Sequence, residues 1–283
     1  MATAIVLLNF GEPADPDRDT VLEYLTRIFY DNADLEDAES EEAAWERSRE
    51  LAQRRLPGLM EEYEEIGGSP LQAQAANQAD ALTESLTDRG HDVTVYHAMQ
   101  FMEPLIDDIP ETLADDGMDE VIAVPIYPLC GPSTTVSSID LLEDAIDETG
   151  EYDPEFSAVT GWHRVPLYNR MRAEGIESFL ADNDVDPNDP DTTFVFSAHG
   201  TPTKYLDEGF RYDEYVEEHA AAIAGMAGIE SYEIGYQNHA NRGIEWTEPE
   251  TEELVEGLGD SAERVVVEPM SFMHEQSETL VEL

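Results

Sequence analysis

TTFVFSAHG, residues 192–200, is the stretch that decides the fold. It begins with β-branched and aromatic residues, which are typical of a strand buried on both faces of a parallel sheet. His199 and Gly200 close the stretch, on the turn that leaves this strand. In open α/β sheets, ligands bind beyond the carboxyl ends of the strands. The stretch therefore predicts an α/β fold with His199 at a binding site.

A second stretch near the C-terminus has the same order. Val-Val-Val at residues 265–267 is a short apolar run typical of a buried strand, and SFMHEQSETL, residues 271–280, follows it. We expect a helix here that carries Glu278. Because this segment also follows a strand, we expect His199 and Glu278 to face one cleft although they are far apart in the sequence.

Apolar runs alternate with amphipathic segments along the whole chain. The expected strands are residues 4–8, 93–97, 120–124, 156–159, 193–196, 232–236 and 265–267, and the expected helices are residues 21–29, 43–64, 75–87, 105–114, 139–147, 168–180, 212–227 and 250–256. This alternation predicts an α/β fold with parallel sheets flanked by helices. A length of 283 residues is typical of two domains. We expect the boundary in the proline-rich residues 125–132, which gives domains of residues 1–127 and 128–283.

The charge of the chain is extreme, since 65 acidic residues stand against 14 basic ones and the net charge is −51. Nucleic acids and anionic membrane surfaces are bound through basic patches, so this balance excludes both as partners. No apolar run approaches about 18 residues, and no basic segment precedes the first apolar run. We therefore expect no transmembrane segment, no signal peptide and a cytoplasmic protein.

Two explanations of this acidity compete. High net charge with low hydrophobicity is typical of disorder, but the apolar runs are too regular for a disordered chain. A halophilic cytoplasm is the other explanation, because about 1 M salt shortens the Debye length to roughly 3 Å and screens the repulsion. We favour the halophile, in which most carboxylates belong to solvated faces.

Six segments in chain order resemble the ferrochelatase family. The family's F-S-A-H-G-x-P matches residues 196–202, and its F-x-S-[DE]-H-x-E-T-L matches residues 272–280. The others are residues 7–13 (LLNFGEP), 66–71 (IGGSPL), 125–128 with 133–135 (PIYP and STT) and 236–237 with 245–246 (YQ and EW). Near the C-terminus two positions depart from the pattern, since Gln276 replaces a histidine and His274 stands where serine is usual, and residues 99–104 and 238–239 depart from it as well. These departures concern substrate choice and metal supply more than the reaction class.

The resemblance implies two similar Rossmann-like domains with an active-site cleft between them. It also implies insertion of Fe(II) into a free-base porphyrin, protoporphyrin IX or coproporphyrin III, in haem biosynthesis. Fe(II) and the porphyrin are then substrates, and no cofactor is bound permanently. Some family members carry an iron–sulfur cluster, but Cys130 is the only cysteine here and cannot hold a four-thiolate cluster. The oligomeric state stays open.

Metallation of a porphyrin removes two pyrrole protons while a metal ion enters. A neutral histidine suits proton acceptance, because its ordinary pKa of about 6.5 lies close to working pH. The resemblance assigns this role, and contact with the metal, to His199. Without the resemblance, a histidine bonded to a loop carbonyl would be the ordinary interpretation. Gly200 beside it would let a flat ligand approach the backbone.

Glu278 is the second expected catalytic residue and metal contact, since a carboxylate opposite the histidine can take the second proton or pass on the metal. Glu275, Glu278 and Glu282 fall three and four residues apart, so in a helix they share one face. Glu282 is the candidate for metal relay, and a solvated acidic face is the alternative. His274 is expected at the surface, with a metal shared with Glu278 as the alternative.

Four residues of the matched segments are candidates for the porphyrin pocket: Phe10, Tyr127, Ser133 and Thr134. The aromatic rings would form an apolar wall and the hydroxyls would bind a propionate, with core packing and helix capping as the alternatives. Arg27 and Arg242 could also bind propionates, but pairing with the abundant carboxylates is the favoured interpretation.

Two other functions remain open at this stage. A cobalt or nickel chelatase of a precorrin-type ring would share the architecture, and a tetrapyrrole or metal carrier would bind without metallating. A carrier needs no general base, so the presence of both His199 and Glu278 disfavours it.

Transfer from molar salt to about 0.05 M salt should destabilise the fold, because the Debye length grows several-fold and surface carboxylates then repel one another. Circular dichroism during thermal unfolding at each salt concentration measures the effect. A melting temperature that stays constant across the series contradicts the halophile interpretation.

Overall fold

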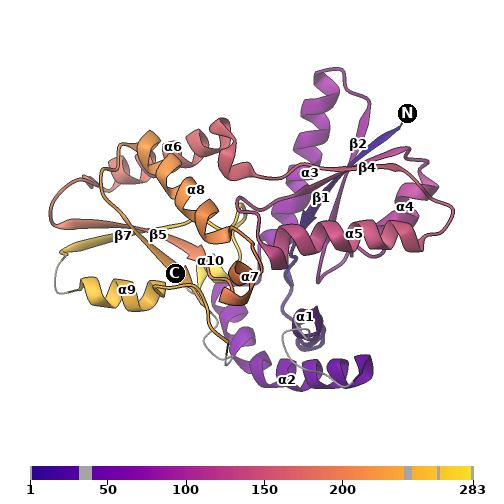
Figure 1. Cartoon of the computed structure of the whole chain (residues 1–283), viewed down its shortest axis with the longest axis horizontal. Helices are drawn as coiled ribbons and strands as arrows, with labels where there is room; N and C mark the ends of the chain where they lie inside the picture. The colour runs from indigo at the N-terminus through magenta and orange to yellow at the C-terminus, as the bar shows by residue number, and fades with distance from the viewer. Residues whose placement is uncertain (1, 32–39, 239–243, 260–261, 282–283) are drawn as a thin grey trace. The chain divides into compact units, whose positions relative to one another are not determined.

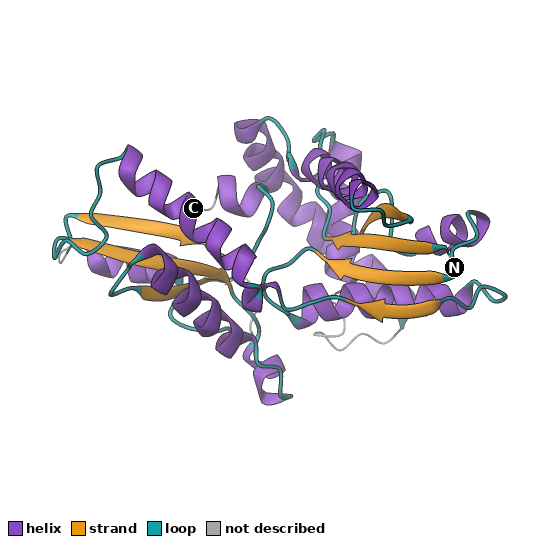
Figure 2. Ribbon diagram, turned by 90° about the horizontal axis from the view of Figure 1, so that it is seen from above, coloured by secondary structure: helices purple, strands orange, loops and turns teal. Residues whose placement is uncertain are grey.

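The computed structural model describes residues 2–31, 40–238, 244–259 and 262–281. The chain forms two compact units, each with its own parallel sheet flanked by helices, as predicted (Figure 1 and Figure 2). Unit 1 consists of Met1–Pro125, Ser138–Val159 and His274–Leu283, and unit 2 consists of Ile126–Ser137 and Thr160–Met273. The units thus interleave along the chain, and the division into α/β domains of residues 1–127 and 128–283 stays a prediction.

The sheet of unit 1 has the order β2-β1-β3-β4, and all neighbouring strands are parallel. Its elements are β1 (Thr3–Asn9), α1 (Arg18–Asp31), α2 (Glu41–Ile66), α3 (Leu71–Asp88), β2 (Val93–Met99), α4 (Ile109–Asp115), β3 (Glu120–Pro125), α5 (Ser137–Glu148), β4 (Glu155–Ala158) and α10 (Ser277–Leu280). Ala98 and Met99, neighbours on β2, point to opposite faces. Ala98 packs in the core with α4 and α5, whereas Met99 packs against Leu71 and Ala75 of α3. Helices therefore bury both faces of this sheet.

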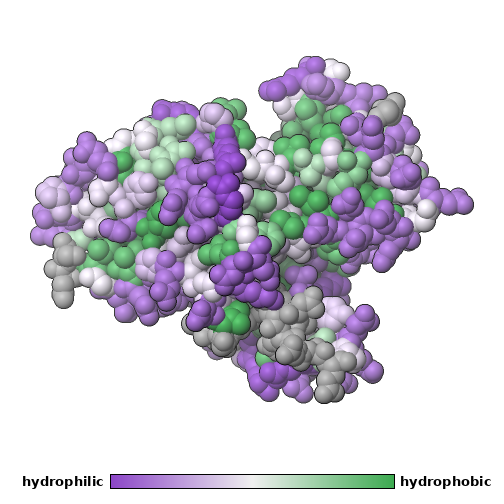
Figure 3. Space-filling model, viewed as in Figure 1, coloured by the Kyte–Doolittle hydropathy of each residue, from purple (hydrophilic) through white to green (hydrophobic). Residues whose placement is uncertain are grey.

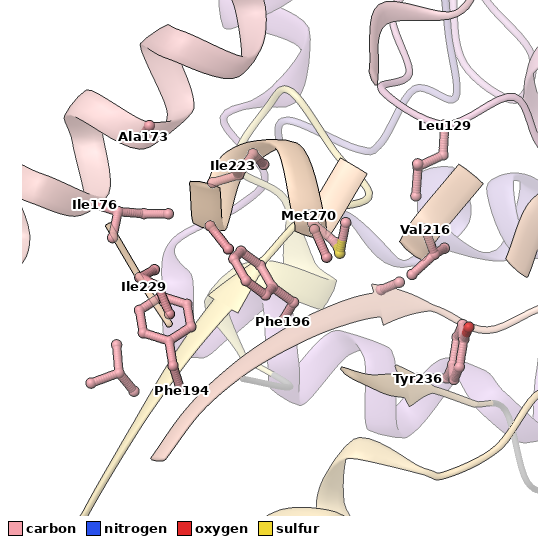
Figure 4. Packing of buried hydrophobic residues seen from close by; sticks show 14 of the residues in the cluster. Leu129, Ala173, Ile176, Phe194, Phe196, Val216, Ile223, Ile229, Tyr236 and Met270 are labelled. Atoms are coloured by element: carbon pink, nitrogen blue, oxygen red, sulfur yellow. The ribbon is translucent and has the colours of Figure 1, made fainter. Parts of the chain in front are cut away.

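The sheet of unit 2 has the order β6-β5-β7, again with parallel neighbours. Its elements are a π-helical turn (Pro132–Val136), a 3-10 turn (Trp162–Arg164), α6 (Pro166–Asp182), β5 (Thr192–His199), α7 (Thr203–Asp207), α8 (Tyr212–Ala227), β6 (Glu233–Gln237), α9 (Thr251–Leu258) and β7 (Arg264–Pro269). Phe194 and Phe196 of β5 point to the side of α6 and α8, where they pack with Ile223 (Figure 4). Ser197 points to the other side and shares a hydrogen bond of 2.8 Å with Thr251 of α9.

The seven expected strands are confirmed, and the expected helices are found with shifted ends. Two helix starts shift by four residues: α3 begins at Leu71 and not at residue 75, and α4 begins at Ile109 and not at residue 105. The late start of α4 is explained by bonds to the end of β2. Met99 N–H donates to the carbonyl of Pro104 at 2.8 Å and the N–H of Ile106 donates to the carbonyl of Met99 at 2.9 Å. These bonds tie the segment to the end of β2 and keep it out of the helix. Among the described residues, no helix combines the length and apolarity needed to span a bilayer.

β1 and β5 occupy equivalent places in their sheets. Each is a central strand that pairs with later strands on both sides, β1 with β2 and β3, and β5 with β6 and β7. The carboxyl end of such a strand is a topological switch point, where open α/β sheets bind ligands. β1 ends at Asn9, directly before Phe10, and β5 ends at His199. Both switch points therefore carry residues that the sequence marks as candidates.

Gly235 is the point where α9 lies closest to the sheet of unit 2. A Cβ at Gly235 would lie 2.7 Å from Thr251 Oγ1 and 2.9 Å from Thr251 Cα. Gly235→Ala should therefore lower the free energy of unfolding by about 1–3 kcal/mol, the usual cost of overpacking. Denaturant unfolding at constant high salt measures this loss.

Gly225→Ala on α8 is the matched control for that substitution. No atom of its surroundings lies within 4 Å of the place where the Cβ would stand. Alanine should therefore be neutral or stabilise the helix by up to about 1 kcal/mol. Equal stabilities of the two variants would contradict this account of how α9 packs.

Candidate active site

The backbone of His199 is held on both sides at the end of β5. Its N–H donates to Ser271 Oγ at 2.6 Å, and its carbonyl accepts from Tyr212 Oη at 3.0 Å. The two hydroxyl groups are buried and lie 3.3 Å apart. Ser271 reaches this place because β7 pairs with β5 in parallel and ends beside it. The position of His199 is thus set by residues that lie far away in the sequence.

The imidazole ring of His199 has a defined tautomer. Its Nδ1 lies 2.6 Å from the carbonyl oxygen of Gly200. A carbonyl oxygen only accepts, so Nδ1 carries the proton of the neutral ring and Nε2 holds the lone pair. The rings of Phe272 and Trp246 stand edge-on to the imidazole, with centroids 6.1 and 6.5 Å away. The bond to the loop carbonyl is therefore compatible with a base or a metal ligand at Nε2.

Contacts within the protein explain why glycine occupies position 200. A Cβ there would lie 1.8 Å from Asn238 Oδ1 and 3.0 Å from the carbonyl oxygen of Gln237. The Gly200 N–H also donates to that carbonyl at 2.7 Å. The close approach of the end of β6 thus requires glycine, and the access of a flat ligand at this point stays a prediction.

Helix α6 forms hydrogen bonds with the end of β7 beside His199. Arg172 Nη2 donates to the carboxylate of Glu268 and, at 2.5 Å, to the carbonyl of Pro269. Ser271, which binds the backbone of His199, follows two residues later. Because the strand end is fixed from the helix side, the hydroxyl that holds His199 is fixed with it.

Unit 1 contains a buried carboxylate that the motifs did not single out, that of Glu12, which is only 3% exposed. It accepts hydrogen bonds from the N–H of Ser277 at 3.1 Å, from Ser277 Oγ and from Tyr63 Oη at 3.3 Å. Gly11 before it has a φ of +82°, and a Cβ there would lie 2.8 Å from Met99 Cβ, so glycine is needed at this turn. The signal in the sequence was Phe-Gly-Glu-Pro, residues 10–13, directly after a buried strand.

Glu278 lies on the short helix α10, in the same unit. Gln276 Nε2 donates to Glu278 Oε2 at 3.3 Å. Burial, helped by the negative charges of Glu12 and Glu62, raises the pKa of Glu278 to about 8. The carboxyl group can therefore exchange a proton near neutral pH, as an acid–base catalyst must.

Two phenols and a phenylalanine belong to the same part of unit 1. Tyr63 and Tyr24 are buried between α1 and α2. Burial and the charge of Glu12 hold the pKa of Tyr63 above its ordinary range, and burial also raises the pKa of Tyr24. Phe10 stands edge-on to Tyr24 at 6.1 Å and to Phe101 at 4.7 Å, and it keeps part of its surface exposed. Its role as a pocket wall stays a prediction.

The expectation of one acidic helix face around Glu278 is wrong for Glu275. Glu275 precedes α10, is exposed, and donates its N–H to Gln74 Oε1 at 3.1 Å. The helix begins after Gln276 because the side chains of Gln276 and Thr279 form a capping box there. Glu282, the candidate for metal relay, lies outside the described residues.

His274 is buried, only 6% exposed, although the sequence analysis placed it at the surface. Its Nδ1 lies 2.9 Å from Asn9 Nδ2, while Asn9 Oδ1 accepts the N–H of Phe10 at 2.7 Å. The amide nitrogen of Asn9 therefore donates to Nδ1, and Nε2 carries the proton of the neutral ring. Burial lowers the pKa of His274 to about 4, so the ring is neutral at pH 7. With its one lone pair bound to Asn9, the ring does not suit a metal shared with Glu278.

The remaining pocket candidates lie in unit 2, in Ile126–Ser137. Tyr127 is buried, and Ser133 and Thr134 are half-buried in the π-helical turn. Gly131 occupies the cap position of that turn, so neither hydroxyl serves as its N-cap. Their contact with a porphyrin stays a prediction.

Arg27 pairs with Glu23 at 2.7 Å and donates to the carbonyl of Phe101 at 3.3 Å. This confirms the favoured interpretation of Arg27 as a partner of a neighbouring carboxylate, whereas Arg242 lies outside the described residues. Within the described ranges, no three His, Cys, Asp or Glu side chains are grouped so that they could hold a metal ion.

Known proteins match nearly the whole chain. The family model described as ferrochelatase matches residues 2–283. The curated ferrochelatase of Trichormus variabilis is 33% identical over 240 residues, which cover 82% of this chain and 60% of that protein. The curated ferrochelatase of a Geobacter species is 29% identical over 283 residues, 99% of this chain and 86% of that protein. The chain thus spans 60% of the length of the first relative and most of the second.

Among solved structures, SirB from Bacillus subtilis with Fe3+ aligns over 94% of this chain and 76% of that chain. The TM-score is 0.49 and the sequence identity 10%.

Glu278→Gln should stabilise the fold at pH 8 relative to the native chain, and the difference should shrink as the pH falls toward 5. The carboxyl group titrates at 4.5 in its ordinary state and at about 8 in the fold. Folding therefore favours the protonated form, so the native chain loses stability as the pH rises from 4.5 to 8 and the glutamine variant does not. Denaturant unfolding at several pH values and constant salt measures the difference.

Glu275→Gln is the control for this pH series, because the exposed Glu275 lies three residues away on the same segment. An equal difference in Glu275→Gln at each pH would mean that the effect comes from removing a carboxylate anywhere on this segment. A stabilisation by Glu278→Gln that is the same at every pH would mean that Glu278 is ionised in the fold throughout this range.

Proposed function

This chain belongs to the ferrochelatase family, and we propose that it inserts Fe(II) into a free-base porphyrin in haem biosynthesis. The match of the family to residues 2–283, a range that contains both His199 and Glu278, carries the proposal. Protoporphyrin IX and coproporphyrin III are the candidate substrates. A cytoplasm rich in salt is the proposed setting, because the chain carries a net charge of −51.

His199 accepts one pyrrole proton on Nε2 and contacts the incoming metal. The bond from Nδ1 to the carbonyl of Gly200 supports this role, because it keeps the lone pair on the opposite nitrogen. The bonds of Ser271 and Tyr212 to the backbone of His199 support it as well, because a base must be held within reach of the proton it takes.

Glu278 couples the arrival of the metal to the release of a proton. With a pKa of about 8, the carboxyl group is largely protonated at pH 7. A divalent cation favours the ionised form, so binding of Fe(II) would displace this proton. The free carboxylate can then take the second pyrrole proton as the metal moves into the ring. Glu12 and Glu62 hold negative charge beside it, which favours the approach of a cation.

A direct assay tests the proposal against its rivals. The protein is incubated in molar salt with Fe(II), Co(II) or Ni(II) and with protoporphyrin IX, coproporphyrin III or a precorrin-type ring, and absorption spectra are recorded. Iron insertion into either porphyrin supports the proposal. Metallation of the precorrin-type ring alone would assign a cobalt or nickel chelatase, and binding without metallation would assign a carrier.

His199→Ala should reduce iron insertion by at least about 10²-fold, the low end for loss of a positioned general base. Porphyrin binding and the fold should persist, because Ser271 and Tyr212 contact only the backbone of His199. Glu278→Gln should cause a similar loss, and the double variant should lose little more, since groups that act on one substrate are not additive.

His91→Ala, at an exposed histidine before β2, is the control and should keep the activity of the native chain. Native activity in His199→Ala would overturn the proposed role of His199. Losses that multiply in the double variant would mean that the two residues act in separate steps.

A further inference from the structure

Helix α6 carries an apolar ridge on its solvent side. Leu167 is 80% exposed, Met171 58% and Phe179 53%, and these are the three most exposed large apolar side chains of the described residues. They follow a spacing of four, in which Gly175 fills the remaining position. Residues spaced by four form one of the ridges through which helices pack against each other. In Figure 3, green hydrophobic surface interrupts the hydrophilic cover over unit 2 in the region of α6 and α8.

The ridge is not part of the core of unit 2. α6 already buries its opposite side, where Ala173, Ile176 and Leu180 pack against the sheet. A helix at the surface normally has one apolar side and one polar side, so a second apolar side marks a contact surface. The chain has 65 acidic residues, so the solvent side of a helix is expected to be charged. The apolar solvent side of α6 departs from this expectation.

No contact within the chain explains why glycine occupies position 175. No atom of its surroundings lies within 4 Å of the place where a Cβ would stand. Glycine within a helix costs about 1 kcal/mol relative to alanine. A gap in the ridge at this place would, however, admit a side chain from outside.

We propose that the ridge of Leu167, Met171, Gly175 and Phe179 joins two copies of this chain, with the two α6 helices antiparallel about a two-fold axis that crosses the ridge at the level of position 173. Positions 171 and 175 are equally distant from 173, so Met171 of each copy fits over Gly175 of the other. Positions 167 and 179 are also equally distant from 173, so Leu167 approaches Phe179 of the other copy. A two-fold contact requires such self-complementarity.

The charged side chains beside the ridge favour a second copy of this chain as the partner. Arg170 pairs with Glu174 at 3.0 Å and with Glu177 at 3.5 Å along one flank of the ridge. The same two-fold axis places the Arg170 of each copy between the Glu174 and Glu177 of the other. This flank is therefore complementary to itself in charge as well as in shape.

Salt and concentration should control the association. Each copy has a net charge of −51, so the copies repel one another unless salt screens them. One pair of helices also supplies less than the ~800 Å² per partner of a standard interface, which predicts a weak dimer. Analytical ultracentrifugation in about 2 M KCl, over micromolar to tens of micromolar protein, should show a reversible monomer–dimer equilibrium.

Met171→Glu should abolish the dimer, and Val159→Glu should leave it unchanged. Val159 is the matched control, because it is 47% exposed and apolar but lies in unit 1 and not on α6. A native chain that stays monomeric in high salt overturns the proposal. Equal loss of the dimer in both variants overturns it too, because the effect would then come from added charge anywhere on the surface.

Gly175→Leu separates a fitted interface from unspecific apolar contact. The leucine meets no atom of its own chain at the Cβ and adds apolar surface to the ridge. If Met171 of the other copy occupies the gap, the dimer should weaken by at least about tenfold, which corresponds to 1.4 kcal/mol. A tighter dimer would overturn the proposed packing. Circular dichroism of this variant should match that of the native chain, since leucine is a good helix former.

Discussion

Parallel pairing around a central strand is the constraint on which the candidate residues of each unit depend. β1 and β5 each pair on two sides, so their carboxyl ends lie at switch points. Beyond those ends the ladder no longer supplies hydrogen bonds, and side chains must satisfy the backbone. Ser271 and Tyr212 do so for His199, and Asn9 does so for Phe10. The side chains that complete the strand ends also fix the residues expected to do chemistry.

Three carboxyl groups lie close together in unit 1, and each is stabilised in a different way. Glu12 accepts hydrogen bonds from Ser277 and Tyr63. Glu62 accepts two from Arg55, at 2.7 and 2.9 Å. Glu278 is stabilised by keeping its proton, which the raised pKa reflects. Burial and the negative charges of Glu12 and Glu62 disfavour the ionised form of Glu278, so this carboxyl group titrates near neutral pH.

His274 and Gln276 both form hydrogen bonds within unit 1. His274 accepts from Asn9, while Gln276 caps the start of α10 and donates to Glu278. Ser277 beside them donates to Glu12. The segment that carries Glu278 is thus tied at two points to the end of β1 and the loop that follows it. Gln276 contacts the glutamate directly, and the imidazole of His274 accepts a hydrogen bond from Asn9 within the protein.

The sequence determined the elements of the fold and the place of His199 at the end of a strand. All seven strands and the α/β class followed from local patterns, because a buried parallel strand and an amphipathic helix each leave a periodic signal along the chain. His199 was placed correctly at a strand end for the same reason, since the strand TTFVF runs directly into it.

Only the tertiary structure decided which acidic and histidine side chains are buried. Glu12 and Glu275 carry the same functional group among 65 acidic residues, yet one accepts three hydrogen bonds in the interior and the other faces solvent. His274 became an interior residue through Asn9, which lies 265 positions earlier. The start of α10 after Gln276 likewise separated Glu275 from Glu278. Burial and proton affinity depend on neighbours that the fold brings together from distant segments, and no local periodicity encodes them.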